Sequence, residues 1–114
     1  MKKLIFLLPI LLLALENIEI NVNKKILKKG ETLILTITTH GNNIVFPNLK
    51  AIEKTPIIAT MIKDTIVVIN GNLIDKVSKL YFLRPDKNIT IPSLEIIVDG
   101  KIYKTNPINI EVKN

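Results

Sequence analysis

The chain has 114 residues, which leaves room for one domain with a single two-layer core. Hydrophobic residues make up 47% of it, which argues against global disorder, and the absence of cysteine excludes disulfides and thiol chemistry. The formal net charge is +6. The basic residues are mostly scattered and are not interleaved with aromatic residues, so the sequence does not predict a nucleic-acid-binding surface.

The N-terminus has the features of a secretory signal peptide. Two lysines follow the first methionine and precede an apolar run that ends at Leu15. A membrane-spanning helix needs roughly 20 apolar residues, and this run is shorter. We therefore expect a signal peptide of residues 1–14, cleaved near Ala14, and a periplasmic mature domain of residues 15–114 without a membrane span. The alternative is an uncleaved N-terminal anchor.

Apolar and polar residues alternate along most of the remaining chain, a pattern typical of β-strands with one buried face. Turn-forming residues recur about every ten residues, and no helix of useful length is predicted. The predicted strand segments are 18–22, 32–39, 44–46, 57–62, 65–69, 77–83, 89–91, 94–98, 101–105 and 108–112. Together they predict an all-β fold, an immunoglobulin-like antiparallel β-sandwich of about seven to nine strands.

The turns between these segments have recognisable chemistry. Asp99-Gly100, between two alternating runs, is the strongest hairpin signal, and Asn70-Gly71 is a second one. We expect Lys63-Asp64 to form a further turn and residues 48–56 to be irregular. Val77–Leu83 is apolar on both faces, which favours a central position in a sheet.

Basic residues are concentrated at one place in the mature chain. They are Lys24, Lys25, Lys28 and Lys29. We interpret this lysine cluster as the protection of a solvated edge strand against pairing with other chains.

No constellation of catalytic residues is evident. The chain has one histidine, His40, and two serines, Ser78 and Ser93, none of them in a nucleophile motif. The four glycines are isolated at turns, and the carboxylates are spread without metal-binding spacing. We therefore expect a non-enzymatic domain without a cofactor or a bound metal.

A series of short motifs occurs in a defined order along the chain. They are Gly30-Glu31, Phe46-Pro47-Asn48-Leu49, Asn70-Gly71, Tyr81-Phe82-Leu83-Arg84-Pro85, Ile89-Thr90-Ile91-Pro92 and the stretch Val98–Ile108. In order and spacing, this series resembles the N-terminal domain of the aerotolerance protein BatD family, from about Ile18 to Val112. The chain departs from the family at Asn88, where a glycine is usual, and in length, because family members typically continue into further β domains and a C-terminal membrane span.

The resemblance implies a role in aerotolerance and envelope stress, without an established enzymatic activity, alongside protein partners that carry von Willebrand factor A domains. Such partner domains commonly hold a divalent metal with an open coordination position, which a carboxylate from another protein can fill. We expect Asp64, in the predicted Lys-Asp turn, and Asp86, in the loop 84–88, to be the partner-binding donors. Asp99 is a weaker candidate because its hairpin already explains it, and all three can be read as ordinary turn residues.

An alternative function is a carbohydrate- or surface-binding β-sandwich. Sugar binding usually requires exposed aromatic side chains. The aromatic residues beyond the signal peptide lie mostly at core-like positions of the predicted strands. They are Phe46, Tyr81, Phe82 and Tyr103.

Overall fold

A computed structural model describes residues 18–114, so the predicted signal peptide of residues 1–14 lies outside the described part. The described chain forms eleven strands and no helix. None of its elements could therefore cross a membrane as an apolar helix. The strands are β1 (Ile18–Val22), β2 (Ile26–Lys28), β3 (Leu33–Thr39), β4 (Ile44–Val45), β5 (Ala51–Ile52), β6 (Thr55–Ile69), β7 (Asn72–Leu83), β8 (Ile89–Ile91), β9 (Glu95–Val98), β10 (Lys101–Lys104) and β11 (Ile108–Lys113).

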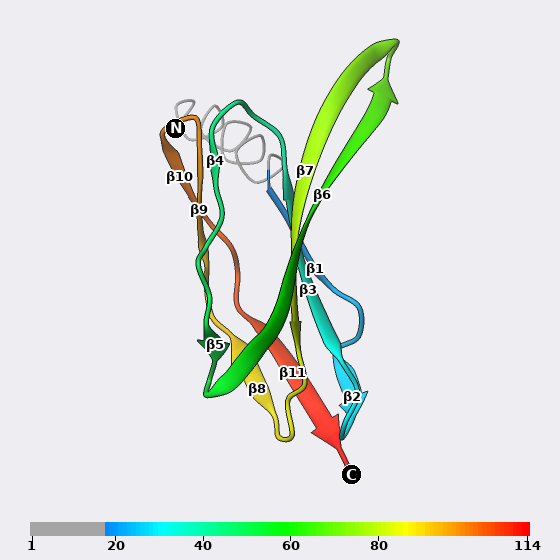
Figure 1. The fold of residues 1–114 in the computed structure, drawn as a ribbon, viewed down its shortest axis with the longest axis vertical. Coiled ribbons are helices and arrows are strands. Elements are labelled where there is room, and N and C mark those ends of the chain that lie inside the picture. The colour runs from blue at the N-terminus through cyan, green and yellow to red at the C-terminus, as the bar shows by residue number, and fades with distance from the viewer. Residues whose placement is uncertain (1–17) are drawn as a thin grey trace, which may run out of the picture.

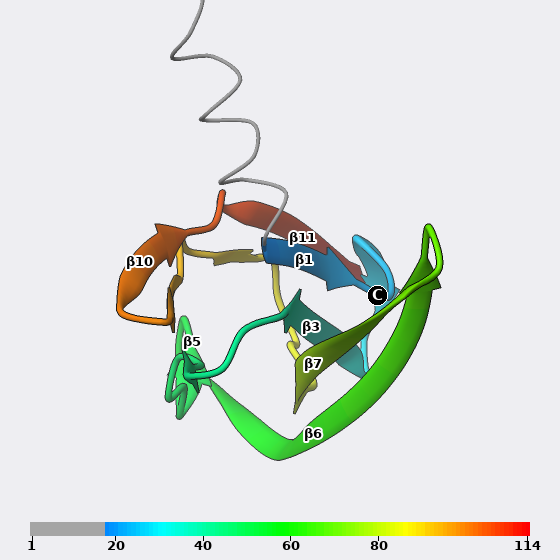
Figure 2. The ribbon, with the colours of Figure 1, turned by 90° about the horizontal axis from the view of Figure 1, so that it is seen from above.

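The strands form one large sheet and two small ones (Figure 1). The large sheet has the order β1-β3-β7-β6-β5, and the small sheets have the orders β10-β9-β4 and β2-β11-β8. Every pairing is antiparallel except that of β2 with β11. All three sheets contribute side chains to one hydrophobic core, around which the strands are arranged in Figure 2. The predicted all-β, immunoglobulin-like sandwich is confirmed.

The core follows from the alternation of buried and partly exposed side chains along strands β3 and β7. Leu33, Leu35 and Ile37 on β3 are fully buried. Leu33 and Leu35 stand opposite two buried residues of β7, Leu83 and Tyr81. Since β7 has a neighbour on each side, β3 and β6, its predicted central position is confirmed.

Tyr81 connects the core to the segment that follows β4. Its ring is completely buried, and its hydroxyl donates a hydrogen bond of 2.6 Å to the Pro47 carbonyl oxygen. Burial raises the pKa of Tyr81 to about 12, because the phenolate would be poorly solvated there. Two of the motifs noted in the sequence, around Phe46-Pro47 and around Tyr81, therefore meet in space.

The two Gly-containing hairpins are confirmed. Asn70 and Gly71 have φ angles of 51° and 80°, and Asp99 and Gly100 have φ angles of 51° and 82°. These left-handed conformations at both central positions are those of a tight two-residue turn, which glycine adopts without strain.

The predicted turn at Lys63-Asp64 is wrong. Strand β6 continues through both residues for 15 residues, and each residue from Ala59 to Ile69 has a partner on β7. Asp64 stands opposite Val77 in this ladder. The long partner strand holds this stretch extended, and pairing prevails over the turn preference of a single dipeptide.

Two short strands were not expected, and they raise the number of strands above the predicted seven to nine. Strand β5 lies within residues 48–56, which were expected to be irregular. Strand β2 lies at the edge of its sheet, and the lysine cluster includes its last residue, Lys28, and the residues on both sides of it. The interpretation of this cluster as edge protection is therefore supported.

Candidate protein-interaction surface

Two connections come together at one end of the sandwich: the β5–β6 turn, Glu53-Lys54, and the β7–β8 loop, residues 84–88. Both contribute to one depression of the surface. The turn is unusual because Glu53 and Lys54 have φ angles of 45° and 70° although neither is glycine. A left-handed conformation costs a non-glycine residue on the order of 1–2 kcal/mol. The surrounding structure must compensate for this strain.

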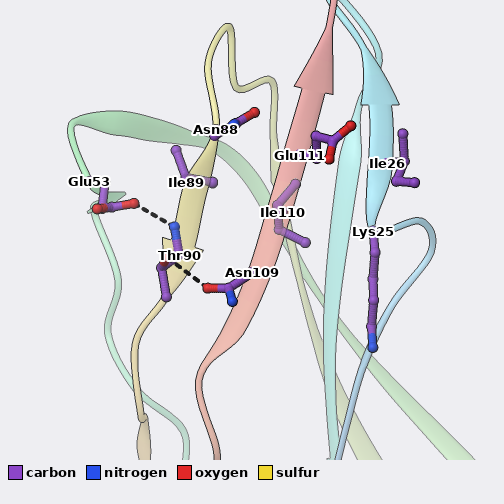
Figure 3. Close-up of a pocket in the computed structure, with 9 residues that line it drawn as sticks. All are labelled: Lys25, Ile26, Glu53, Asn88, Ile89, Thr90, Asn109, Ile110 and Glu111. Carbon is purple, nitrogen blue, oxygen red and sulfur yellow. Dashed lines mark hydrogen bonds between the residues drawn. The ribbon is translucent and has the colours of Figure 1, made fainter.

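The compensation comes from a contact between the turn and strand β8 (Figure 3). The Glu53 carboxylate accepts a hydrogen bond from the backbone N–H of Thr90, and the Thr90 hydroxyl donates one of 3.0 Å to Asn109 Oδ1 on β11. Strand β8 is an edge strand, so the carboxylate satisfies a donor that no neighbouring strand pairs. Through this hydrogen bond, Glu53 links the large sheet to the small sheet that contains β8 and β11.

This contact lies in a shallow depression of about 460 Å³ between β8, β11 and the start of β2 (Figure 3). Its polar side chains mainly hold the fold together. Besides the bonds of Glu53 and Thr90, Asn88 Oδ1 accepts a hydrogen bond of 2.8 Å from the Val112 N–H. The depression contains no serine, cysteine or histidine that could act as a nucleophile or a base.

The residues with catalytic potential elsewhere are not arranged as a site. The Ser78 hydroxyl is hydrogen-bonded to that of Thr38 at 2.7 Å, and His40 is exposed in its loop. No group of three or more metal-ligating side chains occurs within residues 18–114.

Asp86 is exposed on the β7–β8 loop, as expected. The loop is fixed on both sides of it, because Pro85 is fully buried and Asn88 bonds to β11. Within residues 18–114, the Asp86 carboxylate has no hydrogen bond or ion pair. Lys54 and Lys87 line the same small depression as Asp86. The loop therefore presents a carboxylate from a defined position, next to two lysines.

Asp64 is not near Asp86. It stands opposite Val77, which lies six residues before Leu83 at the end of β7. At roughly 3.3 Å per residue, this places Asp64 about 20 Å from the start of the loop that carries Asp86. The two predicted partner-binding residues lie in different regions of the molecule and do not form one site.

Asp99 has a structural role. Its Oδ1 atom accepts hydrogen bonds from the backbone N–H groups of Asn42 and Asn43, at 3.0 and 2.8 Å. The loop approaches so closely that a Cβ atom on Gly41 would lie 2.5 Å from a methyl carbon of Val98. Asp99 therefore anchors the 40–43 loop.

The first family-like motif has an equally clear role. Gly30 has a φ angle of 95°, and Glu31 accepts a hydrogen bond of 2.6 Å from the Lys28 N–H and forms a 2.9 Å ion pair with Lys24. These two contacts lower the pKa of Glu31. The hydrogen bond from the Lys28 N–H has the larger effect, and the bond from the Lys24 ammonium group has the second largest. The motif closes the turn between β2 and β3.

The last motif fixes the crossing from β10 to β11. Thr105 is buried, and its hydroxyl oxygen accepts a hydrogen bond of 2.9 Å from the Leu94 N–H. Its own N–H donates a bond of 2.9 Å to the Leu94 carbonyl oxygen. Thr105 thus provides the hydrogen-bond partners of both backbone groups of Leu94, the residue just before β9.

The comparison with protein families finds a match over nearly the whole described chain. The family described as the BatD DUF11-like domain matches residues 20–112, which extend from β1 into β11. The chain belongs to the BatD family. The resemblance inferred from the sequence motifs is confirmed. No curated protein and no solved structure matches the chain.

In this BatD-family domain, sequence reasoning missed the contact between Glu53 and Thr90. Thr90 is part of a family-like motif, but its partner lies 37 residues away in the chain. Nothing in the sequence around Glu53 indicates a left-handed turn, because neither residue of that turn is glycine, asparagine or aspartate.

Proposed function

We propose that this BatD-family domain is a non-enzymatic protein-interaction module that acts in the periplasm. The observation that carries the proposal is the Asp86 carboxylate, exposed and without a partner within residues 18–114, on a loop fixed at both sides. Binding residues often lie on loops that a rigid scaffold holds in place. The signal-peptide pattern of residues 1–14 supports the location.

The partner in this proposal is a von Willebrand factor A domain, as the family resemblance implies, and the setting is aerotolerance and envelope stress. Asp86 fills the open coordination position of a divalent metal ion held by the partner, since Mg²⁺ prefers hard oxygen ligands. Lys54 and Lys87 line the depression beside Asp86 and would favour an acidic surface around that metal.

No observation favours the carbohydrate-binding alternative. Of the four aromatic side chains within residues 18–114, Tyr81 is buried, and Phe46, Phe82 and Tyr103 are half-buried. A sugar-binding platform needs an aromatic face that is open to solvent, and none of these four side chains is fully exposed.

The test is titration of residues 15–114 with the purified partner domain, followed by calorimetry, in Mg²⁺ and in chelator. We expect Asp86→Asn to weaken binding by about tenfold or more, because a neutral amide is a poorer metal ligand, and we expect chelator to have a similar effect. Asp64→Asn is the matched control and should bind like the unaltered domain. If affinity responds neither to chelator nor to Asp86→Asn, Asp86 is not the metal-bridging residue.

A further inference from the structure

The hairpin of β6 and β7 extends beyond the body of the domain (Figure 1). Strand β3 accompanies β7 only as far as the pair Thr39–Val77. Strand β5 accompanies β6 only at its first residues, Thr55 and Pro56. We call residues 58–77 the arm. From Thr65 to Lys76 the two strands pair only with each other, whereas residues 59–64 of β6 lie opposite residues of β7 that also pair with β3.

The arm has an apolar surface although it is exposed. Seven of its aliphatic side chains are between 44% and 74% exposed: Ile58, Met61, Ile62, Ile66, Val68, Ile69 and Leu73. Only three other large hydrophobic side chains in residues 18–114 are comparably exposed. A two-stranded hairpin is marginally stable in water by itself, and soluble monomers seldom expose contiguous apolar patches. The apolar composition of the arm is therefore typical of a surface that another polypeptide covers.

The outer edge of β6 is open for strand pairing. Along an antiparallel edge, every second residue directs its N–H and C=O groups outward. Elsewhere in the described chain, the edge strand β2 contains one lysine and is flanked by three more. The edge of β6 from Ile58 to Ile69 has one lysine, Lys63, and no proline. Its single irregularity, at Ile57/Ala59, lies at the start of β6, opposite the last residues of β7. The usual protections against edge pairing are therefore almost absent along the arm.

We propose that the arm is a dimerisation element that pairs with the arm of a second copy of this chain, β6 against β6, around a two-fold axis. The charges of the arm support a second copy as the occupant. Its four charged residues are Lys63, Asp64, Asp75 and Lys76, so the arm is neutral although the chain as a whole carries +6. Two basic domains can approach each other through this neutral element without general repulsion.

The charges of β6 restrict the register of this pairing, and the proposal places its centre at Thr65. In a two-fold antiparallel pair, directly opposed residues share a face, so the centre falls on one residue. A centre at Lys63 or Asp64 opposes like charges, which is unfavourable. A centre at Thr65 opposes the two Thr65 residues. It also places Asp64 opposite the second copy's Ile66, and Ile62 opposite the second copy's Val68.

The exposed apolar area of the arm is similar in size to the apolar part of a specific interface. Full burial of one aliphatic side chain removes roughly 100 Å² of apolar surface from water. At the exposed fractions given above, the seven side chains offer about 400 Å² per copy. A standard interface takes roughly 800 Å² per partner, of which slightly more than half is apolar. The arm thus exposes apolar area close to that amount. Pairing of β6 with β6 covers the part of it on β6, where opposed side chains of the two copies contact each other.

The first test uses a single cysteine, which is informative because the chain has none of its own. Thr65→Cys places two sulfur atoms across the two-fold axis, at the Cα separation that a disulfide accepts. We expect rapid formation of a disulfide-linked dimer under mild oxidation. The matched control is Asn72→Cys, on the same arm but on the other strand, which should remain largely monomeric. Equal cross-linking of the two variants, or none by Thr65→Cys, would overturn the proposal.

The second test compares two charged substitutions at Ile66, which is 66% exposed and therefore tolerant of change. Ile66→Asp opposes the second copy's Asp64, whereas Ile66→Lys offers that carboxylate an opposite charge. Sedimentation equilibrium of the unaltered domain should show a dimer. Ile66→Asp should bind its own copy about tenfold more weakly than Ile66→Lys. If the unaltered domain is monomeric, the proposal is wrong, and the arm would then pair with a strand from a different protein. If the two variants self-associate with equal affinity, the register centred on Thr65 is wrong.

Discussion

Replacing Tyr81 by phenylalanine tests how the buried hydroxyl supports the fold. The substitution keeps the fully buried ring and removes the 2.6 Å hydrogen bond to Pro47. Loss of such a bond, which leaves a carbonyl oxygen without its donor, costs roughly 1–2 kcal/mol of unfolding free energy. We expect a loss of this size at pH 8.

The pH dependence of this difference has a definite sign. Burial raises the pKa of Tyr81 from 10.0 to about 12, so the folded state keeps the proton longer than the unfolded state. The contribution to stability is complete below pH 10 and is lost as the pH rises towards 12. One pH unit corresponds to about 1.4 kcal/mol, so the difference between the unaltered domain and Tyr81→Phe should vanish near pH 11 and reverse above it.

The assay is urea unfolding followed by circular dichroism, at several values of pH between 8 and 12. Tyr103→Phe is the control, because the Tyr103 hydroxyl has no hydrogen bond within residues 18–114, and it should cost less stability at pH 8. A difference between the unaltered domain and Tyr81→Phe that stays constant up to pH 12 would refute the reasoning.

Further substitutions test the turns by the same unfolding assay. Lys54→Gly should stabilise the domain by up to about 1 kcal/mol, since glycine accepts a φ angle of 70° without strain; a loss would mean that the turn is not strained. Glu31→Gln should destabilise at neutral pH. Because the pKa of Glu31 is lowered, this difference should shrink as the pH falls below about 4.5; an unchanged difference at pH 3 would contradict the role of the carboxylate. Thr105→Val should cost roughly 1–3 kcal/mol, because the buried Leu94 N–H loses its acceptor, and a neutral result would exclude that bond as a support. Gly100→Val should also destabilise, because valine resists a φ angle of 82°; no fall in melting temperature would contradict the assignment of the turn.

Some features of the candidate site follow from the sequence, and others depend on the tertiary structure. The exposure of Asp86 follows from its Arg-Pro-Asp-Lys-Asn loop, because Pro85 cannot continue a ladder and the next residues are polar. The distance between Asp86 and Asp64 does not follow from the sequence, since it depends on how far β6 extends. The contact of Glu53 with Thr90 likewise exists only because the sandwich brings two edges together.

The sequence by itself determined the elements whose physical cause is local. Alternation in β3 decides which side chains are buried, because successive residues of a strand point to opposite faces. The Asn70-Gly71 and Asp99-Gly100 turns follow from the ease with which these residues adopt left-handed conformations. The tertiary structure alone decided whether β6 turns at Lys63-Asp64, because a Lys-Asp pair accepts both a turn and a strand and the 12-residue partner β7 selects the strand. It also decided that the apolar residues of the arm face solvent, since alternation shows which residues share a face but not whether another layer covers that face.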